Sequence, residues 1–160
     1  QARSRLATDD FGLARFSPVH TGAGARVLYV PGNHDIDAGD FDATQARLRA
    51  TCAALDITWL DRATVTIGAV RFVGTTLWAD FDALASGETD ITRQLKQREK
   101  AFRAANYYLS GNTTLVNSEP LLAEGQRDLA FECQAWLRAA LATPFDGTTI
   151  AVTHAAPTLA

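Results

Sequence analysis

The sequence predicts an α/β fold, and three observations support this class. Short runs rich in branched apolar residues, at 26–30 and 148–152, are typical of buried strands. Longer segments between them carry apolar residues at helical spacing. With 160 residues, of which 47% are hydrophobic, the chain can bury a substantial core. We therefore expect one α/β domain over residues 1–160.

The N-terminal part of the chain is expected to form one helix and one strand. The helix is expected over about 6–16, and small and polar residues at 21–24 indicate a loop. The strand at 26–30 ends at Pro31, because proline has no N–H to donate to a neighbouring strand. Gly32 then lets the backbone turn tightly or approach a neighbour closely. The next residues are thus presented at a strand end, where open α/β sheets usually bind ligands.

The middle of the chain changes from a helical to a strand-like pattern. Asp40 or Asp42 can cap a helix that reaches about residue 55. Three short runs rich in β-forming residues follow, at 57–60, 64–67 and 70–74. Gly68 and Ala69 separate the last two runs, which indicates a local hairpin or meander.

Two longer helices and a strand are expected in the second half. The first helix covers about 92–109, and we interpret Tyr107 and Tyr108 as core or helix-end packing. The second helix begins at 118–120, where Ser, Glu and Pro favour a helix N-terminus. Its apolar stripe consists of Leu129, Cys133, Trp136, Leu137, Ala140 and Leu141. The strand at 148–152 follows.

Charge and cysteine use limit the partners and the location of the protein. The formal charge of −3 and the lack of a long Lys/Arg run give no indication of nucleic-acid binding. Cys52 and Cys133 lie on the apolar sides of predicted helices, so we expect two buried free thiols, which favours a reducing, cytoplasmic location. No apolar stretch reaches the roughly 18 residues that a membrane span requires.

Two predicted strands each end in side chains that can bind a metal. Asn33 and His34 follow the first strand, and His154 follows the last. An amide oxygen and an imidazole nitrogen together suit a borderline divalent ion such as Mn, Fe, Zn or Ni. If Asn33 and His154 share such an ion, the amide oxygen and the nearer ring nitrogen should lie roughly 3–4.5 Å apart. Asp35 is placed to orient His34.

These side chains belong to two short motifs. The first is GNHD at 32–35, and the second is H-x-x-P at 154–157. In this order they resemble the third and fourth motifs of the calcineurin-like metallophosphoesterases, and residues 70–81 are similar to a stretch common in bacterial members. The resemblance covers about residues 26–160. It implies a metallophosphoesterase-like β-sandwich, in which two facing sheets are flanked by helices and a two-metal site lies at the strand ends.

The resemblance also implies a role for each site residue. Asn33 and His154 would coordinate the same metal of a two-metal centre. His34 would lie beside the phosphate, stabilise its charge and protonate the leaving oxygen, while Asp35 would hold the tautomer of His34. Two cations would clamp the phosphate oxygens, and a metal-bound hydroxide would attack in line, so no Ser or Cys nucleophile is required.

Three further motifs of that family have no counterpart in residues 1–160. These are a D-x-H and a G-D before the first motif, and a G-H-x-H after the second. Ala155 stands where many related bacterial proteins carry a second His. The chain also begins at Gln1, contains no Met, and stops soon after a buried strand. We therefore expect a partial domain, incomplete at both ends, from a longer protein.

Two hypotheses about function follow. In the first, the complete parent protein is a metal-dependent phosphoester hydrolase, either a phosphomonoesterase or a phosphodiesterase, and this chain alone has negligible phosphatase activity with manganese. In the second, the domain is truncated or degenerate and serves as a non-catalytic scaffold or binding surface. Simpler interpretations are a plain β-turn for Asn33 and His34 and a backbone-satisfied His154. Asp80 and Asp82, near Trp78, could line a substrate cleft, and their simpler interpretation is as solvated loop carboxylates.

Overall fold

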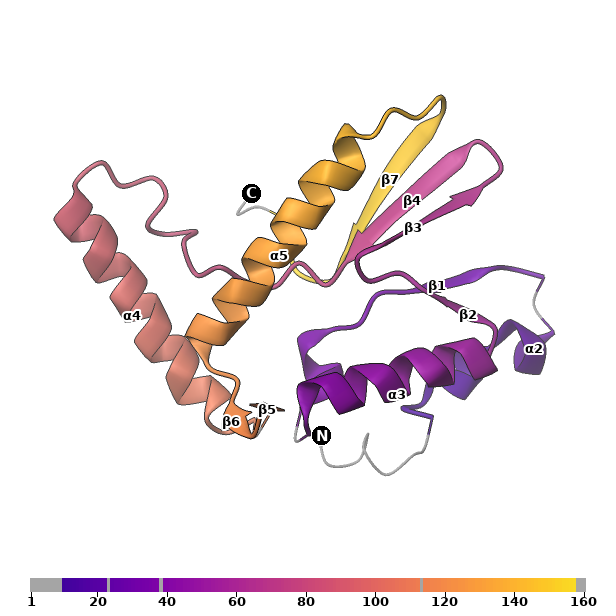
Figure 1. Ribbon diagram of the computed structural model, residues 1–160, viewed down its shortest axis with the longest axis horizontal. Coiled ribbons are helices and arrows are strands. Elements are labelled where there is room, and N and C mark those ends of the chain that lie inside the picture. Colours follow the sequence, from indigo (N-terminus) through magenta and orange to yellow (C-terminus); the bar gives the residue numbers. More distant parts are fainter. Residues whose placement is uncertain (1–9, 23, 38, 113, 158–160) are drawn as a thin grey trace.

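The computed structural model describes residues 10–157 except for 23, 38 and 113 (Figure 1). The mixed α/β class is confirmed, since helices and small sheets share the chain. None of the described helices combines the length and the apolar character that a membrane crossing demands. In chain order the elements are η1 (Leu13–Phe16), α2 (Pro18–Thr21), β1 (Val27–Tyr29), η2 (Asn33–Ile36), α3 (Phe41–Ala54), β2 (Ile57–Trp59), β3 (Ala63–Ile67), β4 (Val70–Thr75), α4 (Ile91–Leu109), β5 (Leu115–Val116), β6 (Glu119–Pro120), α5 (Ala123–Ala142) and β7 (Thr148–Thr153).

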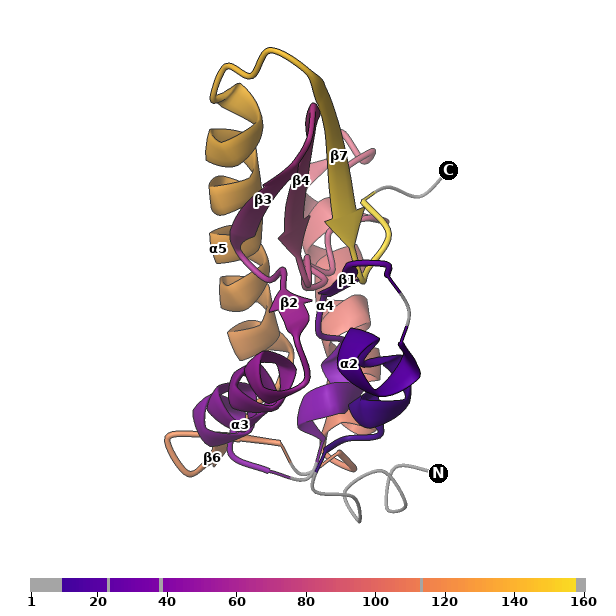
Figure 2. The same cartoon turned by 90° about the vertical axis from the view of Figure 1, so that its right-hand side faces the viewer.

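Two of the sheets are built around parallel strand pairs. β1 pairs with β2 in parallel, while β4 lies between β3, which is antiparallel to it, and β7, which is parallel to it. α5 runs along the three-stranded sheet (Figure 2). Thr75 and Thr153 are register partners at the last residues of β4 and β7, so the two strands end at the same edge. The specific two-sheet sandwich stays a prediction.

The core consists of two apolar clusters. One includes Leu48 and Cys52 of α3 together with Leu13, and the other packs Trp78 against α3 and α5. The expected buried free thiols are confirmed, because Cys52 is 0% and Cys133 is 3% exposed and neither forms a disulfide. Burial raises the pKa of Cys52 to about 11, so this thiol stays protonated near neutral pH.

Side-chain caps set the beginnings of two helices. Asp40, rather than Asp42, caps α3, since its Oδ1 accepts a hydrogen bond of 2.9 Å from the backbone N–H of Ala43. Asp90 caps α4 in the same way and accepts from Thr92 N at 2.8 Å. The predicted hairpin between β3 and β4 is confirmed, and it turns at Gly68, whose φ is 58°.

The predicted helix start at 118–120 is wrong. Asn117 and Ser118 have φ angles of 52° and 69°, and left-handed dihedrals at both central positions suit a tight hairpin turn. β5 and β6 form the two arms of that hairpin, and Pro120 lies at its end. The capping residues at 118–120 therefore serve a turn, and α5 begins only at Ala123.

The predicted helix over 6–16 is wrong where the structure describes it, and residues 6–9 lie outside the described residues. The described part holds only the short 3-10 helix η1, Leu13–Phe16. Phe11 and Gly12 precede it with φ angles of 54° and 76°, which no α-helix accommodates.

Candidate functional site

The structure brings Asn33 and His154 into direct contact. The Nε2 atom of His154 lies 2.9 Å from Oδ1 of Asn33, although 121 residues separate them in the sequence. Asn33 is the first residue of η2, which follows β1, and His154 directly follows β7. The two polar strand ends of the sequence thus meet at one place.

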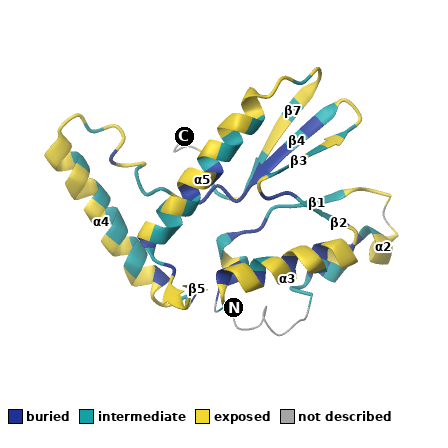
Figure 3. Ribbon diagram, viewed as in Figure 1, coloured by how far each residue is buried: buried dark blue, intermediate teal, exposed yellow. Residues whose placement is uncertain are grey.

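Thr76 joins the strand ends beneath this pair. Its hydroxyl donates to the carbonyl of Pro31 at 3.0 Å, and its own carbonyl accepts from Ala155 N at 3.1 Å. Its backbone N–H donates to Oδ1 of Asp61 at 2.8 Å. Thr76 is 2% and Asp61 6% exposed, next to the buried end of β4 (Figure 3). Sequence reasoning missed both residues, because only the pairing of β4 with β7 makes Thr76 a bridge.

Gly32 leaves the space that the imidazole of His154 occupies. A Cβ built on Gly32 would lie 2.7 Å from Cε1 of His154, which is closer than side chains tolerate. The φ of Gly32 is −100°, so the position requires glycine for space and not for an unusual dihedral. The imidazole of His154 therefore lies between the backbone of Gly32 and the side chain of Asn33.

His34 is oriented by Asp37, and the prediction that Asp35 orients it is wrong. Nδ1 of His34 lies 2.7 Å from Oδ2 of Asp37, whose side chain is 9% exposed. The reason is the 3-10 geometry of η2, because three residues per turn place His34 over the residue three positions later. That i, i+3 spacing was the only sequence signal for Asp37. The His34 side chain is 51% exposed and open to solvent.

Asp35 instead holds the turn that carries the site. Its Oδ2 accepts from Gly32 N at 2.7 Å and from the hydroxyl of Tyr29 at 2.8 Å. Burial raises the pKa of Tyr29 well above its ordinary value, and the nearby charge of Asp35 raises it further, so the phenol remains a donor. Asp35 thereby fixes the backbone from the end of β1 to η2.

The donor pair suits one edge of a metal site. Two ligands at about 2.1 Å from one ion lie about 3.0 Å apart when they subtend a right angle. The observed 2.9 Å between Asn33 and His154 is close to that value and lies just below the lower limit of the predicted interval. Amide oxygen and imidazole nitrogen are also the donors that Mn, Fe, Zn or Ni accept. Among residues 10–157, as far as they are described, no group of three or more His, Cys, Asp or Glu side chains is placed to hold a metal ion.

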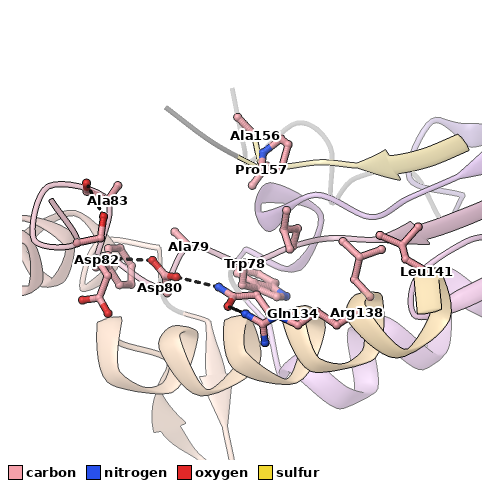
Figure 4. A pocket seen from close by; sticks show the side chains of 15 residues that line it. Trp78, Ala79, Asp80, Asp82, Ala83, Gln134, Arg138, Leu141, Ala156 and Pro157 are labelled. Atoms are coloured by element: carbon pink, nitrogen blue, oxygen red, sulfur yellow. Dashed lines mark hydrogen bonds between the residues drawn. The ribbon is translucent and has the colours of Figure 1, made fainter. Parts of the chain in front are cut away.

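A groove of about 820 Å³ lies beyond the strand ends, between the loop after β4, α5 and residues 155–157 (Figure 4). Trp78 and Leu137 are among its apolar lining residues. Asp80 lines it as well and accepts from Nε2 of Gln134 at 2.8 Å.

The interpretation of Asp82 as a solvated loop carboxylate is wrong. Arg98 and Arg127 both donate to its carboxylate, and together they tie the loop to α4 and α5. Hydrogen bonding from Arg127, helped by Arg98, lowers the pKa of Asp82 to about 2. Asp82 therefore stabilises the loop and is not free to bind a ligand.

Two tyrosines at the end of α4 are more exposed than expected. Tyr107 is 89% and Tyr108 56% exposed, so the interpretation as core packing is wrong. The rings of Tyr108 and His34 form a T-shaped pair, with 6.4 Å between ring centroids. Nothing in the local sequence links residue 108 to residue 34.

Comparison with known proteins finds no matching family model, no curated relative and no solved structure of significant similarity.

Proposed function

We propose that this chain carries one part of the active site of a metal-dependent phosphoester hydrolase, which acts on a phosphomonoester or a phosphodiester in the complete parent protein. The observation that supports it best is the 2.9 Å contact between Asn33 and His154, two metal-competent side chains from two strand ends. The His34–Asp37 pair, on the same turn as Asn33, is the second support.

Each residue has a distinct task in this proposal. Oδ1 of Asn33 and Nε2 of His154 would hold a divalent Mn, Fe, Zn or Ni ion, and a second ion is expected in the parent protein. When bound, the metal supplies positive charge to the phosphate oxygens and lowers the pKa of a bound water.

His34 handles the proton of the leaving group. Its Nδ1 faces the Asp37 carboxylate, which accepts a hydrogen bond, so Nδ1 carries a proton and the orientation of the ring is set. When the ring is protonated on both nitrogens, Nε2 is the atom that donates to the leaving oxygen. The half-exposed ring allows a substrate to reach it.

A non-catalytic scaffold or binding domain is the second candidate function. It is favoured by the finding that the described residues contain no group of three or more His, Cys, Asp or Glu side chains that could hold a metal ion. In that case the 2.9 Å contact is a hydrogen bond that fastens β7 to η2.

Manganese binding distinguishes the two candidates. Mn²⁺ is titrated into isotope-labelled protein, and paramagnetic broadening of the Asn33 amide and His154 imidazole resonances is followed by NMR. We expect saturable broadening that EDTA reverses, and an affinity at least about tenfold weaker in His154→Ala and in Asn33→Ala. His20→Ala is the matched control, since His20 is exposed on α2. An affinity unchanged in His154→Ala would overturn the metal site and leave the scaffold function.

A further inference from the structure

Tyr108 stands beside the proposed proton donor. Its ring plane makes an angle of 79° with the imidazole of His34, at a centroid distance of 6.4 Å. The two rings come from different elements, η2 and the last turn of α4. Tyr108 is 56% exposed, and the His34 side chain is 51% exposed. Both rings are therefore open to a molecule that arrives from solvent.

The end of α4 holds Tyr108 in a fixed position. Oδ1 of Asn106 accepts a hydrogen bond of 2.7 Å from Ala123 N, the first residue of α5. Leu109, next to Tyr108, is 9% exposed and anchors the last turn of the helix. A side chain on such an anchored turn can position a ligand with little loss of conformational entropy.

The arrangement suits an aromatic group attached to the phosphate. The two ring planes are nearly perpendicular and Tyr108 is more than half exposed, so part of that ring stays available for stacking. A leaving group whose oxygen takes the proton of His34 would begin next to this ring. Stacked aromatic pairs gain attraction beyond the burial of their area, which an alkyl group does not.

We propose that Tyr108 is a specificity-determining residue, and that it selects phosphoesters with an aromatic leaving group by stacking on that group. This inference rests on the proposed phosphoesterase function and names its substrate class. Tyr107 serves as an internal comparison, because it is 89% exposed on the same turn and the described ring contact with His34 belongs to Tyr108 alone.

The test compares phenyl phosphate, methyl phosphate and inorganic phosphate. Each is titrated into the zinc-loaded chain, and the Cε1–H resonance of His34 reports binding by NMR. Phenyl phosphate should bind about 2- to 12-fold more tightly than methyl phosphate. Tyr108→Ala should reduce this ratio to about one, while Tyr108→Phe and Tyr107→Ala should keep it. Because Tyr108 is largely exposed, the fold should survive these changes.

The outcomes separate the two proposals. If inorganic phosphate and both esters leave the His34 resonance unmoved, the proposed function fails, and this inference fails with it. If the esters bind with equal affinity, or if Tyr107→Ala removes the preference in place of Tyr108→Ala, the role of Tyr108 is overturned while the phosphate site stands.

Discussion

A methyl group added at Gly32 tests how closely His154 must approach the turn. The φ and ψ of Gly32 are −100° and 167°, an extended conformation that alanine adopts without strain. The effect of Gly32→Ala is therefore purely steric. The new Cβ would lie 2.7 Å from Cε1, 3.0 Å from Nδ1 and 3.1 Å from Nε2 of His154.

The structure sets the size of the expected displacement. Ordinary contact begins at 3.4 Å, so the ring must retreat by about 0.7 Å from its 2.7 Å approach. The distance from His154 to Asn33 then grows from 2.9 Å to as much as about 3.6 Å, which is too long for a hydrogen bond. Unfolding free energy should fall by about 0.5–1.5 kcal/mol because this hydrogen bond is lost. A separation of about 3.6 Å still lies within the roughly 3–4.5 Å at which two ligands share one ion, so zinc affinity should change by less than about tenfold.

Titration with Zn²⁺, followed by calorimetry and by the imidazole resonances of His154, measures the effect, and urea unfolding measures stability. Gly87→Ala is the matched control, because a Cβ at Gly87 has nothing within 4 Å. Unshifted His154 resonances together with wild-type stability in Gly32→Ala would refute the steric reasoning.

Four further predictions follow from the same structure. Asp37→Ala should shift the imidazole ¹⁵N resonances of His34, whereas Asp35→Ala should leave them in place but lower stability by about 1–3 kcal/mol, since Asp35 pairs two other donors. The pKa of Asp82 is about 2, below its ordinary 3.8, so the stability that its carboxylate contributes is present above about pH 4 and lost as the pH falls through 2. In urea unfolding, the difference in unfolding free energy between the wild type and Asp82→Asn should shrink by on the order of 1–2 kcal/mol over that range. Leu48→Ala should cost about 2–5 kcal/mol in urea unfolding, because Leu48 is 0% exposed. The chain alone should hydrolyse p-nitrophenyl phosphate negligibly with manganese in a colorimetric assay.

For each of these four predictions, one experimental result would contradict it. Equal ¹⁵N shifts in both Asp variants would mean that Asp35 also orients His34. A pH-independent gap for Asp82→Asn would contradict the two ion pairs with arginine. Leu84→Ala should cost less than about 0.5 kcal/mol because Leu84 is 70% exposed, so a similar loss at both leucines would contradict the assigned core. Robust, EDTA-sensitive turnover would contradict the expected inactivity of the chain.

The elements that the sequence predicted well have strong periodic or capping signals. α3 and α4 carry helical patterns behind an Asp cap, and β3 and β4 alternate on both sides of Gly68. The wrong predictions lie where the backbone dihedral angles determine whether a segment forms a helix or a turn. Ser118 precedes Glu and Pro as at a helix start, yet its φ of 69° belongs to a turn. Composition does not reveal that choice, because the same polar residues favour both structures.

In the candidate site, too, some contacts were predictable from the sequence and others were not. The proximity of Asn33 and His154 was predicted because each side chain follows a strand and the two motifs resemble parts of one site, although β1 and β7 belong to different sheets. The side chain that contacts the His34 imidazole was not predictable. Asp35 and Asp37 are both near His34 in sequence, and only the 3-10 geometry of η2 selects Asp37. The contact of Tyr108 with His34 was not predictable either, because it depends on how α4 packs against the rest of the chain.

The long separation between Asn33 and His154 would link the proposed metal binding to the order of folding. Their contact closes a loop of 121 residues, which costs on the order of 4 kcal/mol of chain entropy. β7 reaches its place only after α4 and α5 have been traversed and its parallel pairing with β4 has formed. The two donors thus exist as a pair only in nearly completed molecules. If the pair binds zinc, zinc uptake during refolding should therefore lag behind the burial of Trp78. Metal binding would then report when the last folding step is complete.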